Sequence, residues 1–170
     1  HAKALDMLIL GPNMLGFVNF VDGIPVSSVP APAVPAGPIG LLSQSGASSS
    51  AMTDFAMMTG VGLSYMVTLG NEAMVTAGHG LDFLVEDEAT RAIAMFVETI
   101  RDPEVFRSAA LRAAQKGKAI VVLKAGSSEL AARTAAAHTG ALVGDDRVVD
   151  AIFQDLGVIR VDSIEDMLIT

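Results

Sequence analysis

One histidine in the second half of the chain has the surroundings expected of a reactive imidazole. His138 lies in a run of small residues, 135–141, that leaves the ring uncovered. Gly140 follows two positions later and lets another backbone or a phosphate group come close, because glycine has no side chain. The alternative is an ordinary histidine, satisfied on the surface or in the core.

A second group of residues is suited to binding an anion. Ser45, Gly46 and Ala47 follow an apolar run of strand length and begin a predicted helix. Backbone N–H groups at the start of a helix, together with the positive end of its dipole, attract negative charge. The alternative interpretation is that Ser45 is a plain N-cap residue.

Two further loops carry polar residues directly after apolar runs. Glu98 follows the stretch 92–97, where a partly buried carboxylate needs a partner such as Arg101 or a histidine. Gly70, Asn71 and Glu72 predict a tight turn with a left-handed residue. This turn is either purely structural or part of a ligand site.

The histidines and carboxylates do not predict a metal site. His79 lies between two glycines and is interpreted as a loop residue, and His1 is terminal. No second histidine or carboxylate set converges with His138 at the spacing of metal ligands.

From residue 38 onward, apolar runs alternate with helical segments, a pattern typical of βαβ units. Strands are predicted at 39–42, 63–69, 92–97, 119–123 and 158–161. Helices are predicted at 47–59, at 81–86, from Pro103 to just before Gly117, at 148–156, and in a final turn at 167–169 capped by Ser163. The predicted fold is α/β: a flavodoxin-like, doubly wound, mainly parallel five-stranded sheet with helices on both faces. Ligands of such sheets bind beyond the carboxyl ends of the strands, where Ser45 and Glu98 lie.

The start of the chain has a different pattern. Residues 6–10 are an apolar run stopped by a Gly-Pro pair, as a buried strand would be. The four prolines between residues 21 and 37 favour extended geometry. We therefore expect an exit segment of a preceding domain at 1–20, a linker or edge excursion at 21–37, and the flavodoxin-like domain at 38–170.

Composition limits the function classes. The chain has 170 residues, of which 51% are hydrophobic and 18% charged, which fits one packed domain and excludes disorder. A net charge of -8 with scattered Lys and Arg predicts no nucleic-acid or membrane partner. There is no cysteine, no apolar run of spanning length and no signal peptide, so we expect a cytoplasmic protein. The initial His1 predicts a piece excised from a longer chain.

Six stretches of the sequence match a known family in order. They are GPNMLG (residues 11–16), GPIGLLSQSGA (37–47), GNEAMVTAG (70–78), AMFVETIRDP (94–103), AIVVLKAGSS (119–128) and AAAHTGALVGDD (135–146). With these stretches the chain resembles the second domain of the NDP-forming acyl-CoA synthetases, the superfamily of the succinyl-CoA synthetase α subunit and the ADP-forming acetyl-CoA synthetases.

The resemblance implies roles for the candidate residues. His138 would be the phosphohistidine that carries a phosphoryl group between an acyl phosphate and a nucleotide. Glu98 would hold the other ring nitrogen, and the helix start at 45–47, with Gly140, would surround the phosphoryl oxygens. Asn13 and Asn71 are candidates for the substrate side of the site.

Two departures from the family pattern concern the substrate side. Met14 stands where the family commonly has cysteine, and the stretch 70–78 lacks an acidic residue that many members carry after the alanine. These differences predict altered local packing and a branch of the family whose carboxylic acid substrate the sequence does not identify.

The resemblance also implies missing parts: a CoA-binding Rossmann domain, of which residues 1–20 would be the exit segment, and an ATP-grasp domain or subunit. The full enzyme would bind CoA, ATP or ADP, and Mg. The chain alone would bind no cofactor and would be inactive. A homo-oligomer is compatible with the sequence.

Two alternative functions also fit the sequence. One is a non-catalytic anion- or partner-binding flavodoxin-like domain. The other is a serine hydrolase using Ser45, Glu98 and His138, although Ser43 replaces the first glycine of GxSxG.

Overall fold

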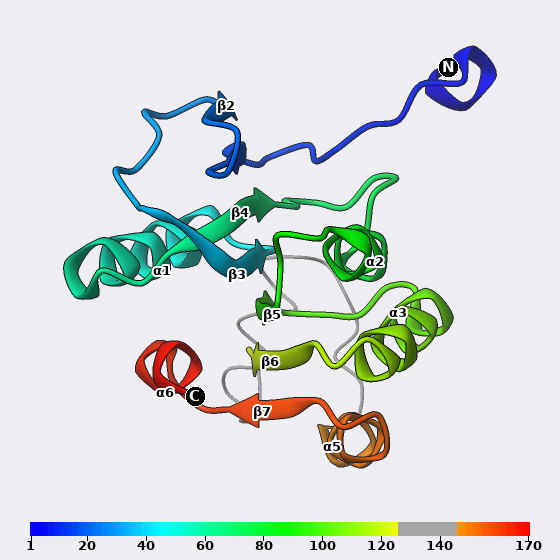
Figure 1. The fold of residues 1–170 in the computed structure, drawn as a ribbon. Coiled ribbons are helices and arrows are strands. Elements are labelled where there is room, and N and C mark those ends of the chain that lie inside the picture. The colour runs from blue at the N-terminus through cyan, green and yellow to red at the C-terminus, as the bar shows by residue number, and fades with distance from the viewer. Residues whose placement is uncertain (126–145) are drawn as a thin grey trace.

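A computed structural model of the chain describes residues 1–125 and 146–170. These residues contain β1 (Gly16–Asn19), β2 (Ile24–Ser27), β3 (Ala36–Ser43), β4 (Leu63–Thr68), β5 (Ala92–Val97), β6 (Ala119–Lys124) and β7 (Ile159–Val161). Their helices are the 3-10 helix η1 (Ala2–Leu5), α1 (Gly46–Thr59), α2 (Ala77–Glu86), α3 (Pro103–Gln115), α5 (Asp146–Asp155) and α6 (Ile164–Ile169). The strands form one sheet in the order β2-β1-β4-β3-β5-β6-β7 (Figure 1).

Five neighbouring strands of this sheet are parallel. Their order, β4-β3-β5-β6-β7, corresponds to 2-1-3-4-5 along the chain, which is the flavodoxin-like order. Leu41 at the centre of β3 pairs with Met66 on one side and with Ala94 on the other. The predicted fold class is confirmed, and the described sheet has seven strands instead of the predicted five.

The helices cover both faces of the sheet (Figure 1). One face packs against α1 and α6, and the other packs against α2, α3 and α5. Met52 of α1 and Met167 of α6 are buried in the first core, whereas Leu84 of α2 and Phe106 of α3 are buried in the second. A sheet buried on both faces explains why its strands read as nearly continuous apolar runs.

Helix α2 begins four residues before its predicted start at residue 81. The first turn could not be predicted from the sequence because it contains Gly78 and Gly80, and glycine is a poor helix former. A Cβ at Gly78 would lie 2.8 Å from the Phe106 nitrogen, and one at Gly80 would lie 2.7 Å from Leu42 Cδ1. The glycines therefore let α2 pack closely against α3 and the sheet. His79 lies on this helix, so its interpretation as a loop residue is wrong.

The start of the chain differs from the prediction. Residues 6–10 do not form a strand, and Leu8 is 81% exposed. The two additional strands, β1 and β2, instead form an antiparallel hairpin that extends the sheet beside β4. Pro25 is tolerated in β2 because this strand is at the sheet edge, where a missing N–H is least costly.

The last helix was predicted only as a short turn. α6 spans Ile164–Ile169, and the Ser163 hydroxyl oxygen accepts a hydrogen bond from the Asp166 nitrogen at 3.0 Å, which confirms the predicted cap. Among the described helices, none combines the length and apolar character needed to cross a bilayer.

Candidate functional site

A cavity of about 670 Å³ lies at the carboxyl ends of β4, β3 and β5. Its described lining is Asn13, Met14, Leu15, Gln44, Ser45, Gly46, Ala47, Gly70, Asn71, Glu72, Glu98, Thr99 and Arg101. The cavity lies where the strand order reverses, between β3 and β5, which is the usual ligand position in doubly wound sheets. Six of the predicted site residues therefore come together: Asn13, Ser45, Gly46, Ala47, Asn71 and Glu98. His138 and Gly140 lie outside the described residues.

The N-terminus of α1 lines this cavity through Ser45, Gly46 and Ala47. Ser45 is the N-cap, and its hydroxyl oxygen accepts a hydrogen bond from the Ser48 nitrogen at 3.2 Å. Gly46 and Ala47 occupy the first two helical positions, whose N–H groups have no acceptor within the helix. Capping by Ser45 and attraction of an anion are thus compatible at this helix start.

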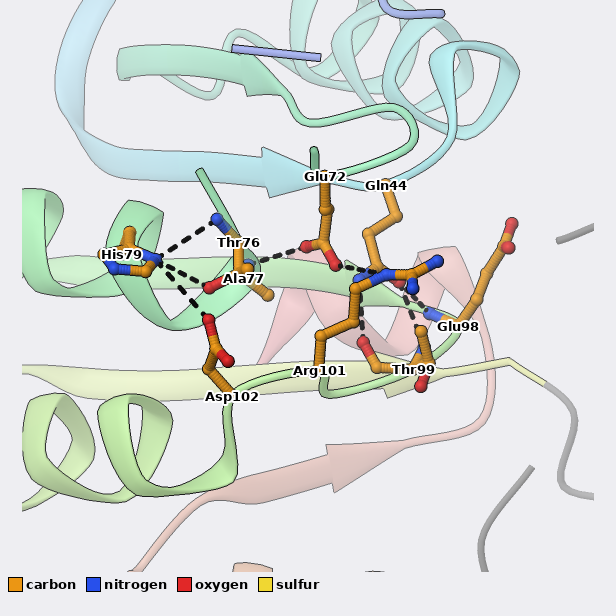
Figure 2. A network of polar contacts seen from close by, with 9 residues as sticks. All are labelled: Gln44, Glu72, Thr76, Ala77, His79, Glu98, Thr99, Arg101 and Asp102. Atoms are coloured by element: carbon orange, nitrogen blue, oxygen red, sulfur yellow. Dashed lines mark hydrogen bonds and ion pairs between the residues drawn. The ribbon is translucent and has the colours of Figure 1, made fainter. Parts of the chain in front are cut away.

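Gln44 joins the loop after β3 to the loop after β5 (Figure 2). Its side-chain oxygen accepts hydrogen bonds from the Glu98 nitrogen at 2.5 Å and the Thr99 nitrogen at 3.1 Å, and its side-chain nitrogen donates to the Thr99 oxygen at 2.7 Å. Gln44 is buried, so these contacts fix the backbone from which Glu98 projects. This role of Gln44 was not predicted from the sequence, since a lone glutamine carries no chemical signal.

The Glu98 side chain extends away from Gln44 (Figure 2). Within the described part of the chain its carboxylate forms no hydrogen bond or ion pair, so the prediction of Arg101 as its partner is wrong. The other predicted partner, a histidine, stays a prediction.

Arg101 instead pairs with Glu72. The Arg101 Nε lies 3.3 Å from Glu72 Oε2, and Glu72 Oε1 accepts a hydrogen bond from the Ala77 nitrogen at 2.6 Å. The Glu72 side chain is only 1% exposed. Burial raises the pKa of the Glu72 carboxyl, an effect that the nearby Gln44 side chain, the Ala77 hydrogen bond and the Arg101 charge partly oppose. Glu72 was predicted only as a turn residue, and its burial was not predicted from the sequence.

The turn that holds Glu72 has the predicted left-handed backbone. Gly70 has φ 58° and Glu72 has φ 53°. A Cβ at Gly70 would lie 2.2 Å from the Pro12 oxygen, so only glycine allows the segment around Pro12 to pack on this turn. This packing brings Asn13 Nδ2 to 3.2 Å from Asn71 Oδ1 at the cavity rim.

His79 lies in the first turn of α2, and its side chain approaches the N-cap residue of α3, Asp102. Its Nδ1 is 2.8 Å from the Thr76 hydroxyl and 3.9 Å from an Asp102 carboxylate oxygen (Figure 2). The Thr76 nitrogen also donates a hydrogen bond to His79 Nδ1 at 3.3 Å, which is one half of a capping box and gives His79 a structural role. In the described ranges, no three His, Cys, Asp or Glu side chains are grouped so that they could hold a metal ion.

One family model matches most of this chain. The family model of the succinyl-CoA ligase like flavodoxin domain matches residues 36–170. The chain belongs to this family.

The relatives of this chain include a subunit of one ADP-forming ligase and a second ADP-forming ligase. The chain is 40% identical over 159 residues to the alpha subunit of acetate–CoA ligase [ADP-forming] I from Pyrococcus furiosus, covering 94% of this chain and 34% of the relative. It is 36% identical over 168 residues to 4-hydroxybutyrate–CoA ligase [ADP-forming] from Nitrosopumilus maritimus, covering 98% and 24%. The predicted resemblance is confirmed, and the chain spans about a third or less of these relatives.

A solved structure gives the same relationship. The dinucleotide-forming acetyl-coenzyme A synthetase 1 of Ca. Korarchaeum cryptofilum, in complex with phosphate and ADP, superposes with a TM-score of 0.91 at 31% identity. The match covers 98% of this chain and 36% of that chain.

Proposed function

We propose that this chain is the phosphoryl-carrying domain of an NDP-forming acyl-CoA synthetase, with His138 as the phosphohistidine. The observation that carries the proposal is the convergence of six predicted site residues, from four separate loops, on one cavity at the point where the strand order reverses. The family membership and the acyl-CoA ligase relatives support the same function.

The proposed reaction interconverts a carboxylic acid, CoA and ATP with acyl-CoA, ADP and phosphate. In the direction of synthesis, an imidazole nitrogen of His138 forms a bond to the γ-phosphorus, and the bond between this phosphorus and the oxygen of the departing ADP breaks. A carboxylate oxygen of the acid then takes the phosphoryl group from the imidazole, which gives an acyl phosphate. The thiolate of CoA attacks the acyl carbon, and phosphate leaves.

The described residues supply two functions for this chemistry. The N–H groups of Gly46 and Ala47 stabilise the oxygens of the phosphoryl group without reorganisation, since the helix already fixes them. Glu98 accepts a hydrogen bond from the second ring nitrogen of His138, which sets the tautomer and leaves the other nitrogen free to accept the phosphoryl group. Gln44 holds the Glu98 backbone in place for this contact.

The remaining functions belong to other parts of the synthetase. The chain spans about a third or less of its relatives, and it contains no GxxxxGK[ST] motif for a nucleotide. We assign CoA binding to a preceding Rossmann domain and nucleotide and Mg binding to an ATP-grasp domain or subunit. The isolated chain should then make no acyl-CoA, and the whole enzyme should act in the cytoplasm.

The test measures acyl-CoA synthesis by the full-length protein that contains this chain, with acid, CoA and ATP. His138→Ala should abolish synthesis, and Glu98→Gln should slow it by about 10²- to 10⁴-fold, the range for an orienting carboxylate. His79→Gln is the matched control, because glutamine at this helical position preserves the capping box, and it should retain the wild-type rate.

Two results would show that the proposed function is wrong and would favour another function instead. If His138→Ala and Glu98→Gln only lowered the melting temperature, with the specific activity of the folded fraction unchanged, the domain would bind an anion or partner without catalysis. Labelling of Ser45 by a fluorophosphonate, together with ester hydrolysis, would instead indicate the serine hydrolase.

A further inference from the structure

The cavity contains one cationic side chain among its described lining residues. This is Arg101, and the carboxylates of Glu72 and Glu98 line the same cavity. The proposed reaction brings carboxylate and phosphate groups into this space. Binding such groups between two carboxylates requires a positive charge, because like charges at close range repel.

Arg101 is anchored by a rigid partner. Glu72 is almost completely buried, and its Oε1 is tied to the first residue of α2 by the hydrogen bond from the Ala77 nitrogen. Its Oε2 is buried and has no hydrogen bond among the described residues, so the Arg101 guanidinium 3.3 Å away is its charge partner there. The Nε edge of the guanidinium is therefore held on a fixed carboxylate.

The other end of the guanidinium is available to a ligand. Arginine carries five N–H donors, and the ion pair with Glu72 is formed through Nε. The two terminal amino groups donate no hydrogen bond within the described ranges, and the Arg101 side chain is 40% exposed. Figure 2 shows the guanidinium extending from Glu72 toward the side of the site where Gln44 and Glu98 lie.

We propose that Arg101 binds an oxyanion of the substrate in this cavity through its two terminal amino groups. The shared chemistry of the ligand is a carboxylate or phosphate group with two oxygens that face the planar fork of the guanidinium. The inference rests on the proposed function and adds the residue that recognises the acid or the phosphate. Glu72 limits the rotation of the fork, so less side-chain freedom is lost when the ligand binds.

The test uses steady-state kinetics of the full-length protein in both directions. Synthesis gives the KM for the carboxylic acid, and the reverse reaction from acyl-CoA and ADP gives the KM for inorganic phosphate. Arg101→Gln should raise at least one of these two KM values by about 10- to 100-fold, the loss expected for hydrogen bonds to a charged group. The kcat at saturating ligand should fall much less, and the KM that rises identifies the oxyanion.

Two further variants separate recognition from folding. Arg101→Lys keeps a charge beside Glu72 but loses the bidentate fork, so it should raise the same KM by a smaller factor. Arg91→Gln removes an exposed arginine that precedes β5, at the opposite end of the strands, and should leave both KM values unchanged.

The outcomes distinguish the two proposals. If both Arg101 variants showed the same KM values as Arg91→Gln while the wild-type enzyme turned over, the inference would be wrong and the proposed function would stand. If the wild-type protein made no acyl-CoA from acid, CoA and ATP, the proposed function would fail and this inference would fail with it.

Discussion

Replacing Gln44 with methionine tests whether this side chain holds the two loops of the site together. Methionine has a similar length but cannot replace the three hydrogen bonds that Gln44 forms with the backbone at Glu98 and Thr99. Each such bond contributes about 0.5–1.5 kcal/mol to stability. Because water from the cavity can reach part of the freed groups, we expect the free energy of unfolding to fall by about 2–3 kcal/mol.

Urea unfolding monitored by circular dichroism measures this change. The matched control is Gln115→Met, since Gln115 is exposed at the end of α3, and it should lie within about 0.5 kcal/mol of the wild type. A Gln44→Met variant as stable as this control would refute the assignment of Gln44 as the link between the loops.

Two other predictions concern the turn after β4. Gly70→Ala should lower the free energy of unfolding by about 1–3 kcal/mol more than Gly117→Ala does. Both glycines have positive φ, but only a Cβ at Gly70 would collide with another part of the chain, the Pro12 oxygen. Equal losses of stability in urea unfolding would contradict this prediction. Burial raises the pKa of Glu72, so the folded state binds its proton more tightly than the unfolded state, and stability should fall as pH rises above about 4.3. Glu72→Gln should lessen this fall above about pH 4.3, and an unchanged slope would oppose the assignment.

The sheet could be predicted because its signals are local. The apolar run at 92–97 coincides with β5, and the run at 119–123 ends one residue before β6 does. Each parallel strand is buried on both faces, so it reads as a continuous apolar segment between polar or glycine-rich loops. The hairpin of β1 and β2 was missed because each strand has four residues and one of them contains Pro25.

The site could be predicted only in part. The rule that ligands bind at the carboxyl ends of parallel strands was enough to select Ser45 and Glu98. Gln44 and Glu72 were missed because their roles depend on tertiary contacts, such as the bond between Gln44 and the Glu98 nitrogen 54 residues away. A single sequence does not record such pairings, since an amide or a carboxylate at a strand end is also common in ordinary turns.

Covalent phosphate on His138 is the most direct test of the proposed function. The full-length protein is incubated with ATP labelled at the γ-phosphate, quenched in parallel with acid and alkali, and analysed by peptide mapping. We predict label on the peptide containing His138 that is lost in acid, survives in alkali, disappears on addition of ADP and is absent from His138→Ala. Absence of label from the active wild-type enzyme, or label that persists in folded His138→Ala, would contradict this function.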